Sequence, residues 1–139
     1  MKIESDLKLD FSSVLIRPKR STLSSRNEVT LEREFKFVHS DDTWNGVPIM
    51  VSNMDTIGTI DMLKSVSSHK ILTCLHKYID INTLLDALKE DESLINYMVL
   101  STGISDKDWN QLNNNIDLLM ENNIKPKFIC VDVANGYME

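Results

Sequence analysis

The chain has 139 residues, of which 42% are apolar and 26% charged, and its formal net charge is −6. This length suits one domain with a hydrophobic core. The negative charge argues against a nucleic-acid-binding domain, because phosphate contacts need a basic surface. No segment reaches the ~18 apolar residues of a membrane span, and the acidic start does not fit a signal peptide. We therefore expect a cytoplasmic protein.

The first part of the chain, residues 1–46, is predicted to be an N-terminal arm that packs around the rest. It holds one short basic cluster, Arg17, Lys19, Arg20 and Arg26, which charge alone assigns to a solvated loop. Further on, apolar and charged residues alternate over residues 31–37. This alternation is typical of an exposed or edge strand.

Four apolar runs follow, and each ends in polar residues. They predict strands over residues 48–53, 71–76, 97–101 and 127–132. Near-continuous apolar runs of this length are typical of strands buried on both faces, as in parallel sheets.

Helical spacing of apolar residues between these runs predicts helices over residues 59–69, 80–90 and 106–121. Asp80 is the expected N-cap of the second helix. The predicted inner face of the third helix consists of Trp109, Leu112, Ile116, Leu119 and Met120.

Alternating strands and helices favour the α/β class. A doubly wound sheet would usually carry a glycine-rich fingerprint after an early strand, and the four glycines form no such motif. We therefore favour a (β/α)8 TIM barrel, which needs about 250 residues. The chain would cover the N-terminal arm, residues 1–46, and about the first four strands, residues 47–139.

The carboxyl ends of barrel strands are where active sites form, so the polar residues there are candidates. Asn53 and Asp55 can bind ligand hydroxyl or amide groups, or equally form a turn before a helix. Lys77, after His76, can bind phosphate or handle protons, or be a surface lysine. Asp132 can cap a helix, or share a ligand with Lys77 as an acid–base couple.

Other chemistries find little support in the sequence. We find no serine–histidine–aspartate pattern, no phosphate-binding loop and no metal-ligand spacing. The two cysteines, Cys74 and Cys130, lie in predicted strands, so we expect reduced, core-facing thiols that are not nucleophiles.

Several motifs, in order along essentially the whole chain, resemble the IMP dehydrogenase/GMP reductase family, and within it the GMP reductases. The segments that carry this resemblance are residues 9–11, 14–23, 25–26, 53–56, 58–59, 76–77, 101–103 and 129–137. The short link between the second helix and third strand, and the Asp132-Val133-Ala134-Asn135-Gly136-Tyr137 run, lean toward the reductase.

The resemblance implies a TIM barrel that uses NADPH to convert GMP to IMP and ammonia, as a cytoplasmic homotetramer. Lys77 and Asp132-Val133-Ala134 would border the NADPH, with supporting catalytic roles open to Lys77 and Asp132. Ser25 and Arg26 would reach the cofactor of a neighbouring subunit, and an arginine suits the 2′-phosphate of NADP.

The family's catalytic cysteine loop, its potassium site and its GMP phosphate loops have no counterpart in this sequence. We therefore expect the chain to be an N-terminal portion with no catalytic nucleophile and no metal site, inactive alone. The alternative is a non-catalytic half barrel that binds a nucleotide or another subunit. Such a module would have to pair its open, apolar sheet edges.

Overall fold

The computed structural model describes residues 5–137. The chain divides into two compact units, Met1–Thr30 and Leu31–Glu139. In the first unit two 3-10 turns, η1 (Phe11–Ser13) and η2 (Arg26–Glu28), are capped by Asp10 and Ser25. No residue between 5 and 30 is buried, so this unit forms no core of its own among the described residues.

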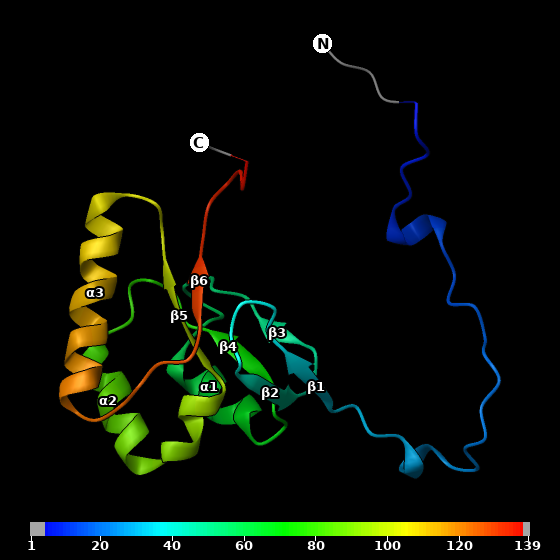
Figure 1. Cartoon of the computed structure of the whole chain (residues 1–139), viewed down its shortest axis with the longest axis horizontal. Helices are drawn as coiled ribbons and strands as arrows, with labels where there is room; N and C mark the ends of the chain where they lie inside the picture. The colour runs from blue at the N-terminus through cyan, green and yellow to red at the C-terminus, as the bar shows by residue number, and fades with distance from the viewer. Residues whose placement is uncertain (1–4, 138–139) are drawn as a thin grey trace. The chain divides into compact units, whose positions relative to one another are not determined.

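The second unit contains a parallel sheet of four strands, drawn as arrows in Figure 1: β3 (Met50–Val51), β4 (Leu72–Cys74), β5 (Met98–Thr102) and β6 (Ile129–Val131). The strands pair in chain order, and all three pairings are parallel. Each strand lies within or overlaps its predicted segment, which confirms the predicted parallel α/β sheet. Within the described residues, β3 and β6 are the edges of the sheet.

Three helices connect the strands: α1 (Ile60–Ser67), α2 (Ile81–Glu90) and α3 (Asp106–Glu121), with a 3-10 turn, η3 (Glu92–Asn96), after α2. Each begins at a side-chain cap that accepts backbone N–H groups: Thr59, Asp80 and Ser105. The predicted cap at Asp80 is confirmed.

The two central strands, β4 and β5, are covered by side chains on both faces. Toward the helices, Leu75, Met98 and Leu100 join a core with Leu63 of α1 and Leu84 of α2. On the other face, Leu72, Cys74 and Val99 form a second cluster with Trp44. Burial on both faces explains the nearly continuous apolar runs of β4 and β5, whereas the edge strands β3 and β6 are partly exposed in the described residues.

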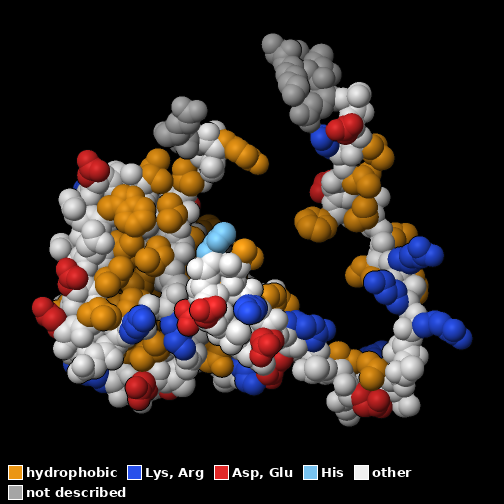
Figure 2. Space-filling view, in the orientation of Figure 1, with side chains coloured by type: hydrophobic (Ala, Val, Ile, Leu, Met, Phe, Trp, Pro, Cys, Tyr) orange, Lys and Arg blue, Asp and Glu red, His pale blue; other side chains and the backbone are white. Residues whose placement is uncertain are grey.

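One predicted helix face is only partly right. Leu112 and Leu119 of α3 are buried, but Trp109 and Met120 are 40% and 51% exposed. Figure 2 shows apolar side chains gathered beside α3, and Ile129 and Val131 of β6 are also exposed. The prediction of an inner position for Trp109 and Met120 is wrong because, in the described residues, no further helix packs beside β6.

An antiparallel hairpin, β1 (Arg33–Lys36) and β2 (Thr43–Gly46), precedes the sheet. It confirms the predicted exposed strand. Trp44 packs in the second cluster, and its Nε1–H donates to the carbonyl of Asn96 (3.1 Å). These contacts make the hairpin part of the second unit, so the units divide after Thr30, whereas the predicted arm extends to residue 46.

No helix among residues 5–137 is long and apolar enough to cross a lipid bilayer.

The hairpin leads to a stability test at Gly46. A Cβ there would meet the ring of Trp44 and lie 2.6 Å from the Lys70 carbonyl oxygen. Gly46→Ala should therefore lower the free energy of unfolding by about 1–3 kcal/mol, the usual cost of overpacking. Gly136→Ala is the matched control, because its Cβ would meet nothing within 4 Å. Urea unfolding followed by circular dichroism measures both, and equal stabilities would contradict the prediction.

Candidate functional site

The carboxyl ends of the four parallel strands lie at one edge of the sheet, and the segments that follow them carry the predicted polar residues. Asn53 and Asp55 follow β3, Lys77 follows β4, and Asp132 follows β6. Asn53 is half-buried, whereas Asp55 and Asp132 are exposed. The fold therefore brings these three segments to a common edge.

The loop after β3 is held down by backbone hydrogen bonds. The N–H groups of Ile57 and Gly58 both donate to the Met54 carbonyl, and the N–H of His76 donates to the Gly58 carbonyl (2.9 Å). A Cβ at position 58 would collide with the Cys74 carbonyl and lie 2.8 Å from that of Ser52. Glycine at 58 thus lets this loop pack against the end of β4.

The side chain of Lys77 points to α3. Its Nζ lies 3.0 Å from Asp108 Oδ1 and 5.4 Å from the centroid of the Tyr78 ring. The hydrogen bond to Asp108 raises the pKa of Lys77, while hydrogen bonds from Ser105 and then Lys77 lower the pKa of Asp108. Lys77 is therefore an ammonium at neutral pH, which donates hydrogen bonds and does not act as a base in this pairing.

Asp108 is a residue of this site that the sequence interpretation did not identify. It lies in the first turn of α3, where its N–H donates to Ser105 Oγ and Ser105 Oγ–H donates to Asp108 Oδ2 (2.6 Å). The spacing of Ser105 and Asp108 at a helix start is a capping-box signal, which predicts this local structure. That signal does not predict the contact with Lys77.

Asp132 is tied to β5 through its backbone, because its N–H donates to the Thr102 carbonyl (2.7 Å). Val133 is half-buried and Ala134 exposed. Among residues 5–137 no hydrogen bond or ion pair joins Asp132 to Lys77, whose partner is Asp108. The predicted direct Lys77–Asp132 couple is therefore not formed in this structure, although a shared ligand at the edge stays a prediction.

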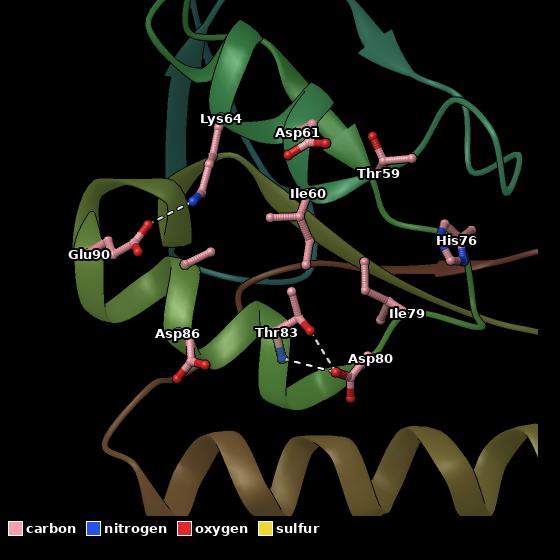
Figure 3. A pocket seen from close by; sticks show the side chains of 11 residues that line it. Thr59, Ile60, Asp61, Lys64, His76, Ile79, Asp80, Thr83, Asp86 and Glu90 are labelled. Carbon is pink, nitrogen blue, oxygen red and sulfur yellow. Dashed lines mark hydrogen bonds and ion pairs between the residues drawn. The ribbon is translucent and has the colours of Figure 1, made fainter.

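His76 faces a different environment from Lys77. It lines a groove of about 380 Å³ between α1 and α2, shown in Figure 3, together with Thr59 and Ile79. The charged side chains that line the groove are mainly acidic, and Lys64 in its wall is paired with Glu90 (2.7 Å). The acidic residues that line it are Asp61, Asp80, Asp86 and Glu90. Such a lining repels nucleotide phosphates, so we do not place a nucleotide there.

Both cysteines are free thiols. Cys74 is buried, and this burial together with the neighbouring Cys130 raises its pKa to about 12. It is therefore protonated and unreactive at neutral pH. Cys130 faces the core as predicted, since it packs against the cluster around Trp44, but it is only half-buried because its strand β6 is an edge of the described sheet. Within residues 5–137 no group of three potential metal ligands occurs.

The remaining predicted residues, Ser25 and Arg26, lie in the first unit. Ser25 Oγ accepts the N–H of Asn27 (3.3 Å) as the cap of η2, and Arg26 is exposed.

Comparison with known proteins finds relatives of one kind. No family model matches the chain. GMP reductases from Shigella boydii serotype 18 and Escherichia coli O81 are each 46% identical to it over 140 residues. The one from Citrobacter koseri is 46% identical over 142 residues. These alignments cover 100% of the chain but 39% of each relative, so the chain spans about two fifths of their length.

A solved structure supports the fold. The crystal structure of inosine 5′-monophosphate dehydrogenase from Legionella pneumophila superimposes with a TM-score of 0.63, covering 93% of this chain and 36% of that one at 22% identity. The resemblance predicted from the motifs is thereby confirmed: along its whole length this chain resembles a portion of GMP reductase, in the IMP dehydrogenase/GMP reductase family.

Proposed function

We propose that this chain forms part of a GMP reductase, which converts GMP to IMP and ammonia with NADPH as the reductant. The observation that carries the proposal is the 46% identity to GMP reductases over the entire chain. The residues that the resemblance assigns to the cofactor, Lys77 and Asp132–Ala134, follow β4 and β6 at one edge of the sheet.

The architecture proposed for the complete enzyme is an eight-stranded TIM barrel, of which β3 to β6 are the first four strands. Two features of the sheet support this proposal. Its strands are parallel and in chain order, as in a barrel. Its edge strands also leave Met50, Ile129 and Val131 exposed, which further strands and helices would cover.

The residues at the carboxyl edge fit part of an NADPH site. Lys77 is a cation with ammonium hydrogens for phosphate or amide oxygens, and the exposed carboxylate of Asp132 can accept hydrogen bonds from hydroxyl or amide groups. Val133 and Ala134 would contact the cofactor beside them. When bound, NADPH supplies the hydride that reduces the purine.

A second part of the cofactor site is proposed to come from a neighbouring subunit, through Ser25 and Arg26. The exposed guanidinium of Arg26 suits the 2′-phosphate of NADPH, because its fork of N–H groups binds phosphate through paired hydrogen bonds. This role requires an oligomer, and we propose the homotetramer implied by the family, in the cytoplasm.

The chain alone is proposed to be inactive because neither thiol suits nucleophilic attack on the purine. Burial of Cys74 raises its pKa to about 12, so the thiol is protonated at neutral pH. Cys130 packs against the cluster around Trp44 and Val99. Covalent catalysis needs an aligned thiolate, so the nucleophile, and the potassium ion that the family implies, would be held by residues outside this chain.

A second candidate is a non-catalytic half barrel that binds a nucleotide or another subunit. The observation that favours it is the exposed apolar surface along the sheet edges and α3, which would need a protein partner. The activity test below separates the two candidates.

The isolated chain should not oxidise NADPH in the presence of GMP. Activity should appear when it is mixed with a polypeptide containing the remaining part of the Citrobacter koseri GMP reductase, because that part would supply the nucleophile. NADPH absorbance measures turnover, and each polypeptide alone is the control. Turnover by the isolated chain would contradict its inactivity, and a stable complex without activity would favour the non-catalytic module.

In the assembled enzyme, Lys77→Ala should reduce turnover roughly 10²-fold or more, a loss typical of a group that stabilises charge or a proton at the reacting centre. Lys64→Ala removes another paired lysine, in the groove between α1 and α2, and serves as the control. If Lys77→Ala lowers turnover no more than Lys64→Ala does, Lys77 is a surface lysine without a role in the reaction.

The cysteines should react in a fixed order. Cys130, which is half-buried, should be alkylated by iodoacetamide at pH 8 before Cys74, whose thiol is buried and stays protonated. Mass spectrometry of peptides from the native and the urea-unfolded chain measures both rates. In the assembled enzyme, Cys74→Val and Cys130→Ala should leave turnover nearly unchanged. Loss of turnover in a correctly folded Cys130→Ala variant would show that the nucleophile lies in this chain.

A further inference from the structure

The segment that carries Lys77 is held by one face of α3. Ser105, Asp108 and Gln111 follow one another at intervals of three residues, which places them on the same side of the helix. Asp108 contacts the Lys77 ammonium (3.0 Å), and Gln111 Nε2–H donates to the Lys77 carbonyl (3.0 Å). Both the backbone and the side chain of Lys77 are therefore fixed by α3.

We propose that Asp108 is a positioning residue, which holds the ammonium group of Lys77 at the carboxyl edge of the sheet, ready to bind an anionic or carbonyl oxygen of the cofactor. The contact between Asp108 and Lys77 does not depend on what the protein binds. Its use in cofactor binding rests on the function proposed above.

The carboxylate of Asp108 is well placed for this role because it is itself held in place. Its Oδ2 accepts the hydroxyl of Ser105 (2.6 Å) while its Oδ1 accepts from Lys77, and its side chain is only 20% exposed. Fixing a lysine side chain costs conformational entropy. Because the rigid Asp108 carboxylate already holds Lys77, part of this cost is met on folding and is not added when a ligand binds.

Gly103, at the end of β5, leaves the space that this pair occupies. A Cβ at position 103 would collide with the Asp108 carboxylate and lie 3.4 Å from Lys77 Nζ. Gly103 is itself buried. The Lys77 ammonium therefore lies close to the backbone at Gly103, just after β5, and beside the start of α3.

The Lys64–Glu90 pair shows how an ordinary surface ion pair differs. It is shorter (2.7 Å), but its side chains are 43% and 70% exposed, against 32% and 20% for Lys77 and Asp108. An exposed pair of this kind contributes little and is screened by salt. Lys64 and Glu90 are therefore a matched control for the more enclosed pair.

Two titratable groups act on the Lys77 ammonium in the described residues: Asp108 on α3, and Tyr78 beside it in the chain. Both favour the charged form of Lys77, and Asp108 has the larger effect. Asp108→Asn removes the negative charge but keeps an oxygen that can accept the Ser105 hydroxyl. The variant should thus retain the start of α3 and lower the pKa of Lys77.

The experiment uses the whole chain with its lysines reductively methylated with ¹³C-formaldehyde, which keeps their charge and gives each an NMR signal. Lys77→Arg assigns the signal of Lys77, and Lys64→Arg that of Lys64. A pH titration should show a lower midpoint for Lys77 in Asp108→Asn, with Lys64 unchanged. Glu90→Gln should lower the midpoint of Lys64 and leave that of Lys77 unchanged. Asp108→Glu, which keeps the charge, should restore part of the Lys77 shift.

An unchanged Lys77 midpoint in a folded Asp108→Asn chain would overturn the positioning. If Asp108→Asn fails to fold by circular dichroism, Asp108→Glu decides, because its longer side chain must change the Lys77 signal if the two groups are in contact. NADPH added to the assembled enzyme tests the use of the pair, because the proposed cofactor site also includes residues outside this chain. Binding that weakens at least about tenfold in both Lys77→Ala and Asp108→Asn supports it. A lowered midpoint in Asp108→Asn together with equal NADPH binding by the parent and variant assembled enzymes would support the positioning and count against the proposed cofactor role.

Discussion

Parallel pairing between neighbouring strands is the interaction on which the candidate site depends. Because β3, β4, β5 and β6 run in the same direction, their carboxyl ends meet at one edge, and residues far apart in the sequence are collected there. The pairing also requires a helix between successive strands, since a parallel return cannot be made by a tight turn. Parallel pairing of β5 with β6 thus requires a connection such as α3, and α3 is the helix that holds Lys77.

Burial on both faces of the sheet sets a second constraint. The helices cover one face, while Trp44 of the hairpin packs with Leu72, Cys74 and Val99 on the other. A buried thiol in that environment loses its nucleophilic form, because desolvation disfavours the thiolate. Packing thus assigns Cys74 to the core and leaves the polar chemistry to the loops beyond the strand ends.

Much of this arrangement could be predicted from the sequence, because strong local signals agree with the fold. The apolar run around Leu72 predicts a buried strand, and Asp80 before an apolar stripe predicts the start of α2; both are confirmed. Local signals do not say which residue meets which across the chain. The place of Lys77 after a strand makes it a candidate site residue, but its partner Asp108 lies 31 residues further on. Exposure of Trp109 was missed for a similar reason, since helical spacing defines a face but not whether another element covers it.

The pairing of strands in chain order also bears on how the protein folds. Each strand finds its partner after a single intervening helix, so the sheet can grow one unit at a time as the polypeptide leaves the ribosome. The hydrogen bond from Trp44 to Asn96 is different, because it closes a loop of 52 residues and waits until η3 has been synthesised. The hairpin can therefore complete its docking only as β5 is added, and until then Leu72 and Cys74 would lie open to chaperones and to other chains.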